Sequence, residues 1–377
     1  MPLSAVLHPA ADDGLDFGAV ERIAVLRANG LGDFIFALPA LRALRLRFPD
    51  AQLVLLGKPW HKRFLTGRGP VVDDVVALPP ITGVGVPPEQ GAREDPRAID
   101  ACIAGLRERR FDLAFQMHGG GRYSNPFIAQ IGARHSFGLH TPDALRLQRS
   151  LPYMRLQNER LRLLEVAALA GAHTWELDPR LPVLVRDEME LESVVRLPDA
   201  PLAVLNPGAT DPRRRWPPAR FARIGDALVD AGAVVVVQGD ASERTLTAAV
   251  TAAMRRPAID AGGRLSLDGL AALLGHACIV VGNDSGPLHL AQAVGAATVG
   301  LYWLTNLVVS GPPTAQCRRV ALSVTADCPV CGRDNVAVRC EHDPCFIEDI
   351  SEDEVLTLTL DLWEQERRDQ AARESGA

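Results

Sequence analysis

Short apolar runs alternate with helix-spaced apolar positions along the start of the chain. Residues 22–27 form an apolar run that ends in the glycine-containing turn 28–32, a pattern typical of a buried strand followed by a tight turn. Residues 33–47 are predicted to be helical, and 52–56 is predicted to be a second strand. The helical stripe consists of Ile35, Leu38, Leu41 and Leu44. Strand, helix and strand with short connections form the unit of a parallel α/β sheet.

A second series of the same kind begins near residue 200. Its apolar runs predict strands at 202–205, 234–237, 278–281 and 298–301. Its periodic segments predict helices at 217–231, 242–254, 266–274 and 287–294. A final amphipathic helix, over about 350–368, is expected to dock back on the body of the protein.

The two series predict an α/β fold with two Rossmann-like domains that face each other across a cleft. The predicted boundaries are 1–190 for the first domain and 200–350 for the second, which includes a cysteine-rich segment at 328–345. Residues 351–377 form a terminal helix and tail. The connection between the two domains is expected around 185–201. A weaker strand at 112–116, followed by a glycine run, belongs to the first domain.

Composition narrows the class of protein. The 377 residues are 47% hydrophobic and 23% charged, as in an ordinary globular protein. The net charge of −6 disfavours a general nucleic-acid binder. The start of the chain carries acids and lacks a basic region ahead of an apolar core, and no apolar run reaches the ~20 residues of a membrane span. We therefore expect a cytoplasmic protein.

A glycine turn followed by an acid closes the first predicted strand. Asn29-Gly-Leu-Gly-Asp33 lacks the third glycine of a dinucleotide fingerprint, because Ile35 occupies that position. Asp33 has two interpretations. It caps the following helix and complements its dipole, or it serves as a general base at the carboxyl edge of the sheet.

Two further motifs indicate a phosphate-bearing ligand. Gly282-Asn-Asp-Ser-Gly-Pro-Leu-His289 joins a strand to a helix whose first N–H groups would suit a diphosphate. Asp284 could accept hydrogen bonds from sugar hydroxyls. Arg213-Arg-Arg-Trp-Pro217 follows the strand that ends in Asn206-Pro-Gly-Ala-Thr210, so these cations are expected at the same edge. The alternatives are a plain capping turn for the first motif and a solvated face for the second.

Together these motifs resemble those of glycosyltransferase family 9, the bacterial heptosyltransferases, over most of the chain. The matching pieces are Gly30-Leu-Gly-Asp33 with Leu38-Pro39-Ala40, Arg213 to Trp216-Pro217, Gly239 with Glu243, Leu265-Ser-Leu267, and Asn283-Asp-Ser-Gly-Pro-Leu-His289. The resemblance implies a GT-B fold. It also implies inverting transfer of heptose from ADP-heptose to a lipopolysaccharide-core or similar glycolipid acceptor.

The resemblance further implies a role for individual residues. Asp33 would be the catalytic base, with Gly32 and Arg122 on the acceptor side. The donor-side residues are Thr210 and Arg214 for the diphosphate, Glu243 for the ribose, the Leu265 backbone for adenine, Asp284 for the sugar, and Ser285, Gly286 and His289 beneath the phosphates. Arg214 stands where the family usually has lysine.

The chemistry agrees with these assignments. An inverting transferase needs one base for the acceptor hydroxyl and a positive environment for the departing diphosphate. The sequence contains no Asp-x-Asp triplet of the metal-dependent type, so we expect arginine and backbone N–H groups to replace a catalytic metal, with no cofactor required. The alternatives are another nucleotide-sugar donor, a non-catalytic sugar-nucleotide-binding protein, or an epimerase of related architecture.

Four of the seven cysteines lie close together, at Cys328, Cys331, Cys340 and Cys345, with His342 between the last two. Four thiolates in a cytoplasmic protein fit a tetrahedral zinc or iron site that would staple the C-terminal segment. The alternative is a loop of reduced cysteines.

A basic and aromatic stretch, residues 58–64, has two interpretations: a solvated face or a peripheral contact with an anionic membrane. Loops at 79–96 and 119–125 are expected to select the acceptor. His118, His135 and His140 show no ligand spacing and are interpreted as ordinary.

Overall fold

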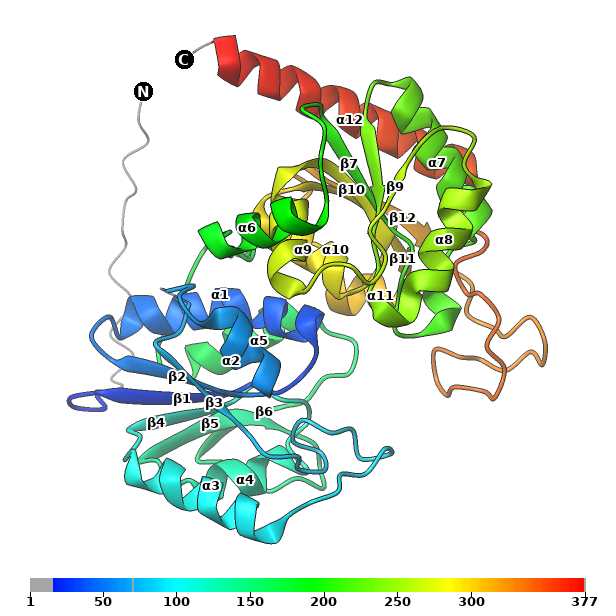
Figure 1. The fold of residues 1–377 in the computed structure, drawn as a ribbon. Helices are drawn as coiled ribbons and strands as arrows, with labels where there is room; N and C mark the ends of the chain where they lie inside the picture. Colours follow the sequence, from blue (N-terminus) through cyan, green and yellow to red (C-terminus); the bar gives the residue numbers. More distant parts are fainter. Residues whose placement is uncertain (1–15, 70, 376–377) are drawn as a thin grey trace. The chain divides into compact units, whose positions relative to one another are not determined.

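The computed structural model describes residues 16–69 and 71–375 (Figure 1). Most of the predicted acidic start lies outside the described residues. Contacts between Cα atoms divide the chain into two compact units. Of the described residues, the first unit comprises 16–29, Phe36–Arg155 and Glu159–Leu177, and the second comprises Gly30–Ile35, Leu156–Asn158 and 178–375. The short segment around Asp33 therefore belongs with the second unit, although the rest of its helix belongs with the first.

The first unit is built on a parallel sheet in the order β3-β2-β1-β4-β5-β6. The strands are β1 (Arg22–Leu26), β2 (Gln52–Gly57), β3 (Asp74–Ala77), β4 (Leu113–Gln116), β5 (His135–His140) and β6 (Arg149–Pro152). The helices are α1 (Leu31–Arg47), α2 (Pro59–Leu65), α3 (Pro96–Glu108), α4 (Ser124–Gln130) and α5 (Glu159–Ala168). α1 and α5 lie on one face of the sheet, and α3 and α4 lie on the other (Figure 1).

The second unit repeats this plan in the order β12-β11-β10-β7-β8-β9, again with every pair parallel. Its strands are β7 (Leu202–Asn206), β8 (Val234–Val237), β9 (Ile259–Asp260), β10 (Ala277–Asn283), β11 (Ala297–Trp303) and β12 (Arg318–Ser323). Its helices are α6 (Val185–Val194), α7 (Pro218–Asp230), α8 (Arg244–Ala253), α9 (Leu267–His276), α10 (Gly286–Val294), α11 (Leu304–Ser310) and α12 (Glu352–Ser375). Short 3-10 turns at η1 (Pro212–Arg214) and η2 (Ala241–Glu243) precede α7 and α8.

Local sequence signals set the ends of several of these helices. The Asp95 side chain accepts the Arg97 N–H at the start of α3, and the Ser266 side chain accepts the Asp268 N–H at the start of α9, as N-caps do. α10 begins with Pro287 in its first turn and ends at Gly295, whose φ of 100° favours glycine. These caps place the first turns of α9 and α10 next to the loops of the predicted donor motifs.

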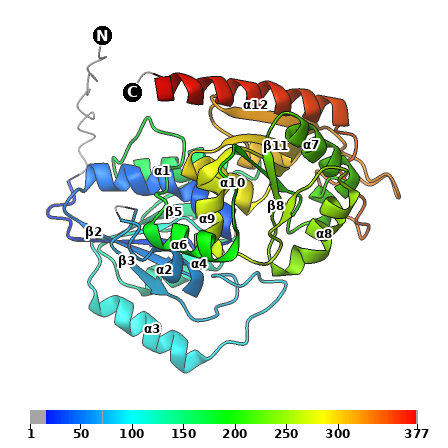
Figure 2. The same cartoon turned by 45° about the horizontal axis from the view of Figure 1, so that its top comes forward.

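The terminal helix packs on the second unit, as predicted. α12 contacts α7 and the strands β10, β11 and β12, and it runs alongside the unit in Figure 2. Val355, Leu362 and Trp363 are buried in the core of the second unit, where the Trp363 indole donates to the Ala231 carbonyl at 3.3 Å. Within the described residues, no helix has both the length and the apolar character needed to span a membrane.

One expected connection is a helix instead. Residues 185–201 were predicted to join the domains, but Val185–Val194 forms α6, which packs against α9 in the second unit. The sequence of α6 is mostly polar, so the one apolar side, on which Leu191 is buried, gives only a weak helical pattern. Part of the expected join is thus an integral element of the second unit.

Candidate functional site

The loops of the predicted donor motifs lie at the carboxyl edge of the second sheet, because all of its strands are parallel. The strand order reverses between β7 and β10, and open parallel sheets form ligand sites at such a reversal. Here the Asn206 amide, at the end of β7, donates to the Ser285 hydroxyl at 2.8 Å. The two predicted motifs therefore meet at the place where this fold opens a site.

Asn283 fixes the same two loops relative to each other. Its side-chain amide donates to the Pro207 carbonyl at 2.7 Å, and its side-chain oxygen accepts the Trp216 N–H at 3.3 Å. Trp216 is fully buried, and its indole donates to the Ile350 carbonyl at 3.1 Å. A buried amide that satisfies both of its polar ends with backbone groups holds those loops in one arrangement.

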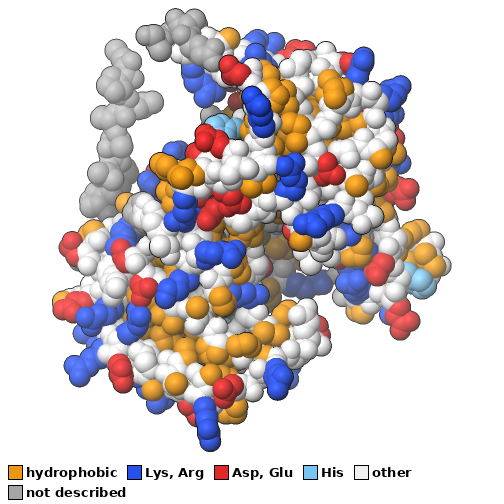
Figure 3. All heavy atoms as spheres, viewed as in Figure 1, with side chains coloured by type: hydrophobic (Ala, Val, Ile, Leu, Met, Phe, Trp, Pro, Cys, Tyr) orange, Lys and Arg blue, Asp and Glu red, His pale blue; other side chains and the backbone are white. Residues whose placement is uncertain are grey.

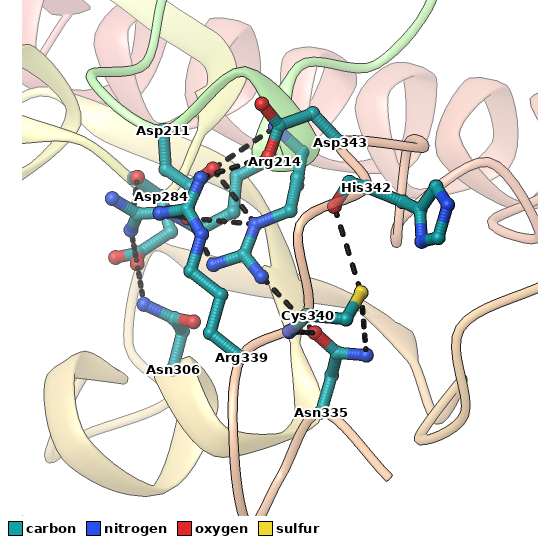
Figure 4. Close-up of polar contacts among 10 residues, drawn as sticks. Asp211, Arg214, Asp284, Asn306, Asn335, Arg339, Cys340, His342 and Asp343 are labelled. Carbon is teal, nitrogen blue, oxygen red and sulfur yellow. Dashed lines mark hydrogen bonds and ion pairs between the residues drawn. The ribbon is translucent and has the colours of Figure 1, made fainter. Parts of the chain in front are cut away.

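Asp284 is buried and accepts from four side chains. Arg214 Nη1 and Asn306 Nδ2 both donate to Oδ2 at 2.8 Å (Figure 4). The Ser310 hydroxyl donates to Oδ1 at 2.8 Å. The His289 Nε2 lies 3.0 Å from Oδ1. Burial alone would raise the pKa of Asp284, but the His289 hydrogen bond and the His289 and Arg214 charges hold it below its usual value. The structure thus makes Asp284 the anchor of Arg214, and its binding of a sugar stays a prediction.

The start of α1 lies against the start of α10. A side chain on Gly32 would approach His289 Cδ2 to 3.1 Å, and one on Gly286 would approach Leu31 Cβ to 3.1 Å. Neither glycine has room for a larger residue without a shift of its neighbours. Asp33, in the first turn of α1 and half-buried, is one residue from this contact. The predicted base, Asp33, therefore directly follows two residues that contact the Gly282–His289 motif.

Glu243 lies beside two glycines at the ends of β7 and β8. A Cβ on Gly208 would be 2.2 Å from Glu243 Oε1, so the carboxylate occupies the space that a side chain there would fill. Its Oε2 accepts the Asp240 N–H at 3.1 Å. Burial raises the pKa of Glu243, and the nearby Asp240 charge adds to the effect. Glu243 follows β8, so it lies at the same carboxyl edge of the sheet as Asp284, and its binding of the ribose stays a prediction.

The other predicted donor residues lie on neighbouring loops. Thr210 is exposed in the loop after β7, and Leu265 is half-buried in the loop between β9 and α9. The residue after Leu265, Ser266, is fixed by Glu190, which accepts from both its N–H, at 2.7 Å, and its hydroxyl, at 2.6 Å. Both loops belong to the same sheet edge, whereas the roles of Thr210 and Leu265 remain predictions.

The three arginines after β7 are held in place rather than solvated. Arg213 is buried and pairs with Asp211, with 2.6 Å between Nη2 and Oδ2. Arg214 bonds Asp284, and Arg215 Nε donates to the Ala209 carbonyl at 2.8 Å. The solvated-face alternative for this cluster therefore fails, because each guanidinium has a defined partner.

The first unit contains a feature that the sequence interpretation missed. Arg27, 1% exposed at the end of β1, donates to the Met117 carbonyl at 2.6 Å and to Glu159 Oε1 at 2.9 Å. His118 accepts the Ala28 N–H on Nδ1 at 3.3 Å. Burial, aided by the Arg27 and Lys58 charges, lowers the pKa of His118 to about 3.

The interpretation of His118 as an ordinary histidine stays a prediction. Strand order in the first sheet reverses between β1 and β4, so His118 lies at that sheet's own switch point. The available signal was the glycine run that follows the 112–116 strand, which resembles the turn after β1. Arg122, in the same loop, is exposed, lies 3.5 Å from Asp143 Oδ2, and covers the Tyr123 ring at 5.5 Å from its centroid.

The basic and aromatic stretch forms α2 and turns much of its surface inward. His61, Phe64 and Leu65 are buried, whereas Lys62 and Arg63 are exposed. On the face drawn in Figure 3, Lys and Arg side chains of the first unit are interspersed with Asp and Glu. These observations favour the solvated-face interpretation of this stretch.

The cysteine-rich segment follows β12 and gathers four potential metal ligands. The side-chain ligand atoms of Cys328, Cys331, Cys340 and His342 all lie within 4.8 Å of one another. Cys345 is not among them, because its Sγ donates to the Arg215 carbonyl at 3.1 Å. The structure therefore corrects the predicted ligand set, with His342 in place of Cys345.

These four residues fit a tetrahedral metal. The Gly332 N–H donates to the Cys328 carbonyl at 2.8 Å, and Gly332 has a φ of 69°, so this tight turn points two thiols to the same side. Ligands of a tetrahedral zinc–thiolate site lie about 3.8 Å apart, close to the observed grouping. The Asn335 hydrogen bond, with that of the His342 backbone, lowers the pKa of Cys340 to about 6, which favours the thiolate that a metal needs. The cluster can therefore bind zinc or iron.

Comparison with known proteins identifies the family and the fold. Residues 100–335 match the model of glycosyltransferase family 9 (heptosyltransferase). The chain is 25% identical to lipopolysaccharide heptosyltransferase 2 of Escherichia coli K12 over 319 residues, 80% of this chain and 88% of that protein. The structure of E. coli ADP-heptose lps heptosyltransferase II superposes with a TM-score of 0.69 at 20% identity, over 92% of this chain and 99% of that one. The dodecameric iron-containing heptosyltransferase TibC gives 0.53 at 14% identity, over 92% and 77%.

The two parallel six-stranded sheets and the likeness to solved heptosyltransferase structures show the predicted GT-B fold. The family model and the curated relatives make the chain a glycosyltransferase. The chain belongs to glycosyltransferase family 9.

Proposed function

We propose that this glycosyltransferase moves a heptose from ADP-heptose to a lipopolysaccharide-core or similar glycolipid acceptor with inversion at the anomeric carbon. The observation that carries the proposal is the convergence of Arg214, Asp284, Glu243 and the start of α10 at one sheet edge. The heptosyltransferase relatives support the donor and the class of acceptor. We assign donor binding to the second domain and acceptor binding to the first.

In the proposed reaction, Asp33 removes the proton from the acceptor hydroxyl. The resulting oxygen attacks the anomeric carbon from the side opposite the diphosphate, and the bond between that carbon and the phosphate oxygen breaks. ADP leaves with the electron pair, and Arg214 and the first N–H groups of α10 stabilise its added negative charge. Asp33 then returns its proton to water. These groups supply the positive environment that a catalytic metal provides elsewhere, so the proposed transfer is metal-independent.

Donor contacts follow the roles implied by the family. Glu243 binds the ribose hydroxyls, the Leu265 backbone meets adenine, Thr210 contacts the diphosphate, and Ser285, Gly286 and His289 lie beneath the phosphates. Gly32 and Arg122 belong to the acceptor side. We also propose a structural zinc or iron at the Cys328, Cys331, Cys340 and His342 cluster, supported by the grouping of these ligand atoms.

The proposal is tested by Asp33→Asn in a transfer assay with ADP-heptose and a heptose-deficient lipopolysaccharide core. Loss of a general base lowers rates by about 10²–10⁴-fold, so the variant should transfer at least a hundredfold more slowly than the parent protein. Binding of ADP, measured by calorimetry, should stay within a factor of about three, because Asp33 is not proposed to contact the nucleotide.

Asp50→Asn, which changes an exposed acid in the turn after α1, is the matched control and should keep full activity. Undiminished transfer by a folded Asp33→Asn protein would rule out the base assignment. Absence of transfer by the parent protein, with ADP bound, would favour another donor sugar or a non-catalytic binding protein.

A further inference from the structure

The cysteine-rich segment packs directly on the arginine turn of the donor site. The Phe346 N–H donates to the Arg213 carbonyl at 2.8 Å, and the Cys345 thiol donates to the Arg215 carbonyl at 3.1 Å. The Phe346 ring also lies under the Arg213 guanidinium, 5.6 Å from ring centroid to Cζ. The turn is therefore held from both sides of Arg214 by residues that follow the candidate metal ligands.

Asn335 links the ligand cluster to the same turn. Its Nδ2 donates to Cys340 Sγ at 3.4 Å, and its Oδ1 accepts the Cys340 N–H at 3.2 Å (Figure 4). The same Oδ1 accepts a hydrogen bond from Arg213 Nη1 at 3.3 Å. Asn335 and Arg213 are both buried, at 7% exposure each. Asn335 thus bonds to Cys340 through both of its polar atoms and to Arg213 through one of them. A buried amide with these contacts transmits the position of the ligand loop to the arginine turn.

Arg213 in turn fixes the groups beside Arg214. It forms the two-point ion pair with Asp211, at 3.0 Å from Nε to Oδ1 and 2.6 Å from Nη2 to Oδ2. Arg339, also from the cysteine-rich segment, lies 4.0 Å from the same Asp211 carboxylate. The next residue, Arg214, reaches Asp284. One continuous set of contacts thus runs from Cys340 to the arginine proposed to bind the diphosphate.

The segment buries few of its side chains. Between residues 328 and 342, the buried side chains are those of Cys328, Asn335 and Cys340, and most others are exposed. A loop with so little buried apolar surface is among the first parts of a protein to open locally. A metal that joins four of its side chains would add a strong constraint, as structural metal sites do.

We propose that metal binding at Cys328, Cys331, Cys340 and His342 sets the position of the Arg213–Arg214 turn and thereby the affinity for the nucleotide diphosphate. Asn335 and Arg213 are the positioning residues of this coupling. The inference rests on the proposed function, because it takes Arg214 as a diphosphate ligand.

The test compares the metal-loaded protein with Cys331→Ser and Asn335→Ala. Cys331 is exposed, so its replacement removes a ligand without opening a cavity. Asn335→Ala keeps all four ligands and cuts the link to Arg213. Cys102→Ser, in the first unit, is the matched thiol control. Each protein is measured for zinc and iron content, for ADP affinity by calorimetry, and for amide hydrogen exchange of residues 211–216.

The parent protein and Cys102→Ser should carry about one equivalent of zinc or iron. Cys331→Ser should lose the metal, exchange faster at 211–216, and bind ADP about tenfold more weakly, the loss expected when one charge-assisted contact is misplaced. Asn335→Ala should keep the metal yet show the same faster exchange and weaker ADP binding.

Two results would overturn the inference: a parent protein without either metal, or metal-free Cys331→Ser with unchanged exchange at 211–216. The exchange measurement needs no nucleotide, so it decides the coupling by itself. Failure of the parent protein to bind ADP, with exchange altered in both variants, would contradict the proposed donor and leave the coupling supported.

Discussion

At the residue scale, the unexpected finding is that four side chains of the protein itself contact the Asp284 carboxylate. The sequence motif indicated an acid that faces a ligand, and the structure surrounds that acid with Arg214, Asn306, Ser310 and His289. Arg214 and His289 could be assigned to the same site from their motifs. Asn306 and Ser310 could not, because they lie in α11, a helix that no sequence pattern predicted, and reach Asp284 only through the fold.

This network makes Asp284 a stability residue, with a testable consequence. Asp284→Asn removes a buried charge that pairs with the half-buried Arg214, and breaking a buried pair costs about 3–5 kcal/mol. We expect the free energy of unfolding of the second unit to fall by about 3 kcal/mol in urea titrations.

The matched control is Asp353→Asn, whose side chain is 90% exposed and should change the free energy of unfolding by less than about 0.5 kcal/mol. Equal effects of the two substitutions would show that the Asp284 charge does not support the fold.

At the element scale, the extent of burial determined which strands and helices could be predicted from the sequence. The central strands β1, β7, β8, β10 and β11 are continuous apolar runs and were predicted from them. The edge strand β6, with the sequence Arg-Ser-Leu-Pro, is only partly buried and has no such run. α6 was missed because its acidic surface outweighs its apolar side. An element with a single apolar side or without a continuous apolar run has too weak a sequence pattern to be predicted. Such an element forms because it pairs or packs with a neighbouring element.

α2 also gives the first unit a sensitivity to acid. The Lys58 N–H donates to His61 Nδ1 at 2.9 Å, so the imidazole caps the helix in its neutral form. Burial lowers the pKa of His61 to about 3, with the Lys58 and Arg27 charges adding to the effect. Between that value and the unfolded value of 6.5, the unfolded chain binds the proton and the folded chain does not. Stability therefore falls as the pH falls below 6.5.

From pH 7.0 to pH 5.5, His61 alone should cost the folded state about 1.3 kcal/mol. His61→Asn keeps an acceptor for the Lys58 N–H and cannot be protonated, so its free energy of unfolding should decline less over the same range by about that amount. His173→Asn, at an exposed position, should follow the parent protein. Parallel pH curves for the parent protein and His61→Asn would contradict the neutral cap.

At the scale of the whole molecule, two separate cores and one proposed donor site lead to a prediction about unfolding. Each unit has its own sheet and its own hydrophobic cluster, so calorimetry should resolve two transitions, and Asp284→Asn should lower the one that belongs to the second unit. A ligand that binds only the folded form adds about 2.7 kcal/mol of stability at one hundred times its Kd. Since the proposed donor contacts all lie in the second unit, ADP should raise that transition alone.

The response to different bases then separates the functions that the family leaves open. Under the heptosyl proposal, ADP raises the second-unit transition by several degrees, while UDP, GDP and dTDP at the same concentration change it little. Glu243→Gln should reduce the ADP shift, because a neutral amide binds the ribose hydroxyls less strongly than a carboxylate. A shift with another nucleotide would retain the transferase and replace the heptose donor. If none of the four nucleotides changes the transition, a degenerate protein that has lost donor binding is favoured. A nucleotide that bound the folded form would raise the transition by mass action.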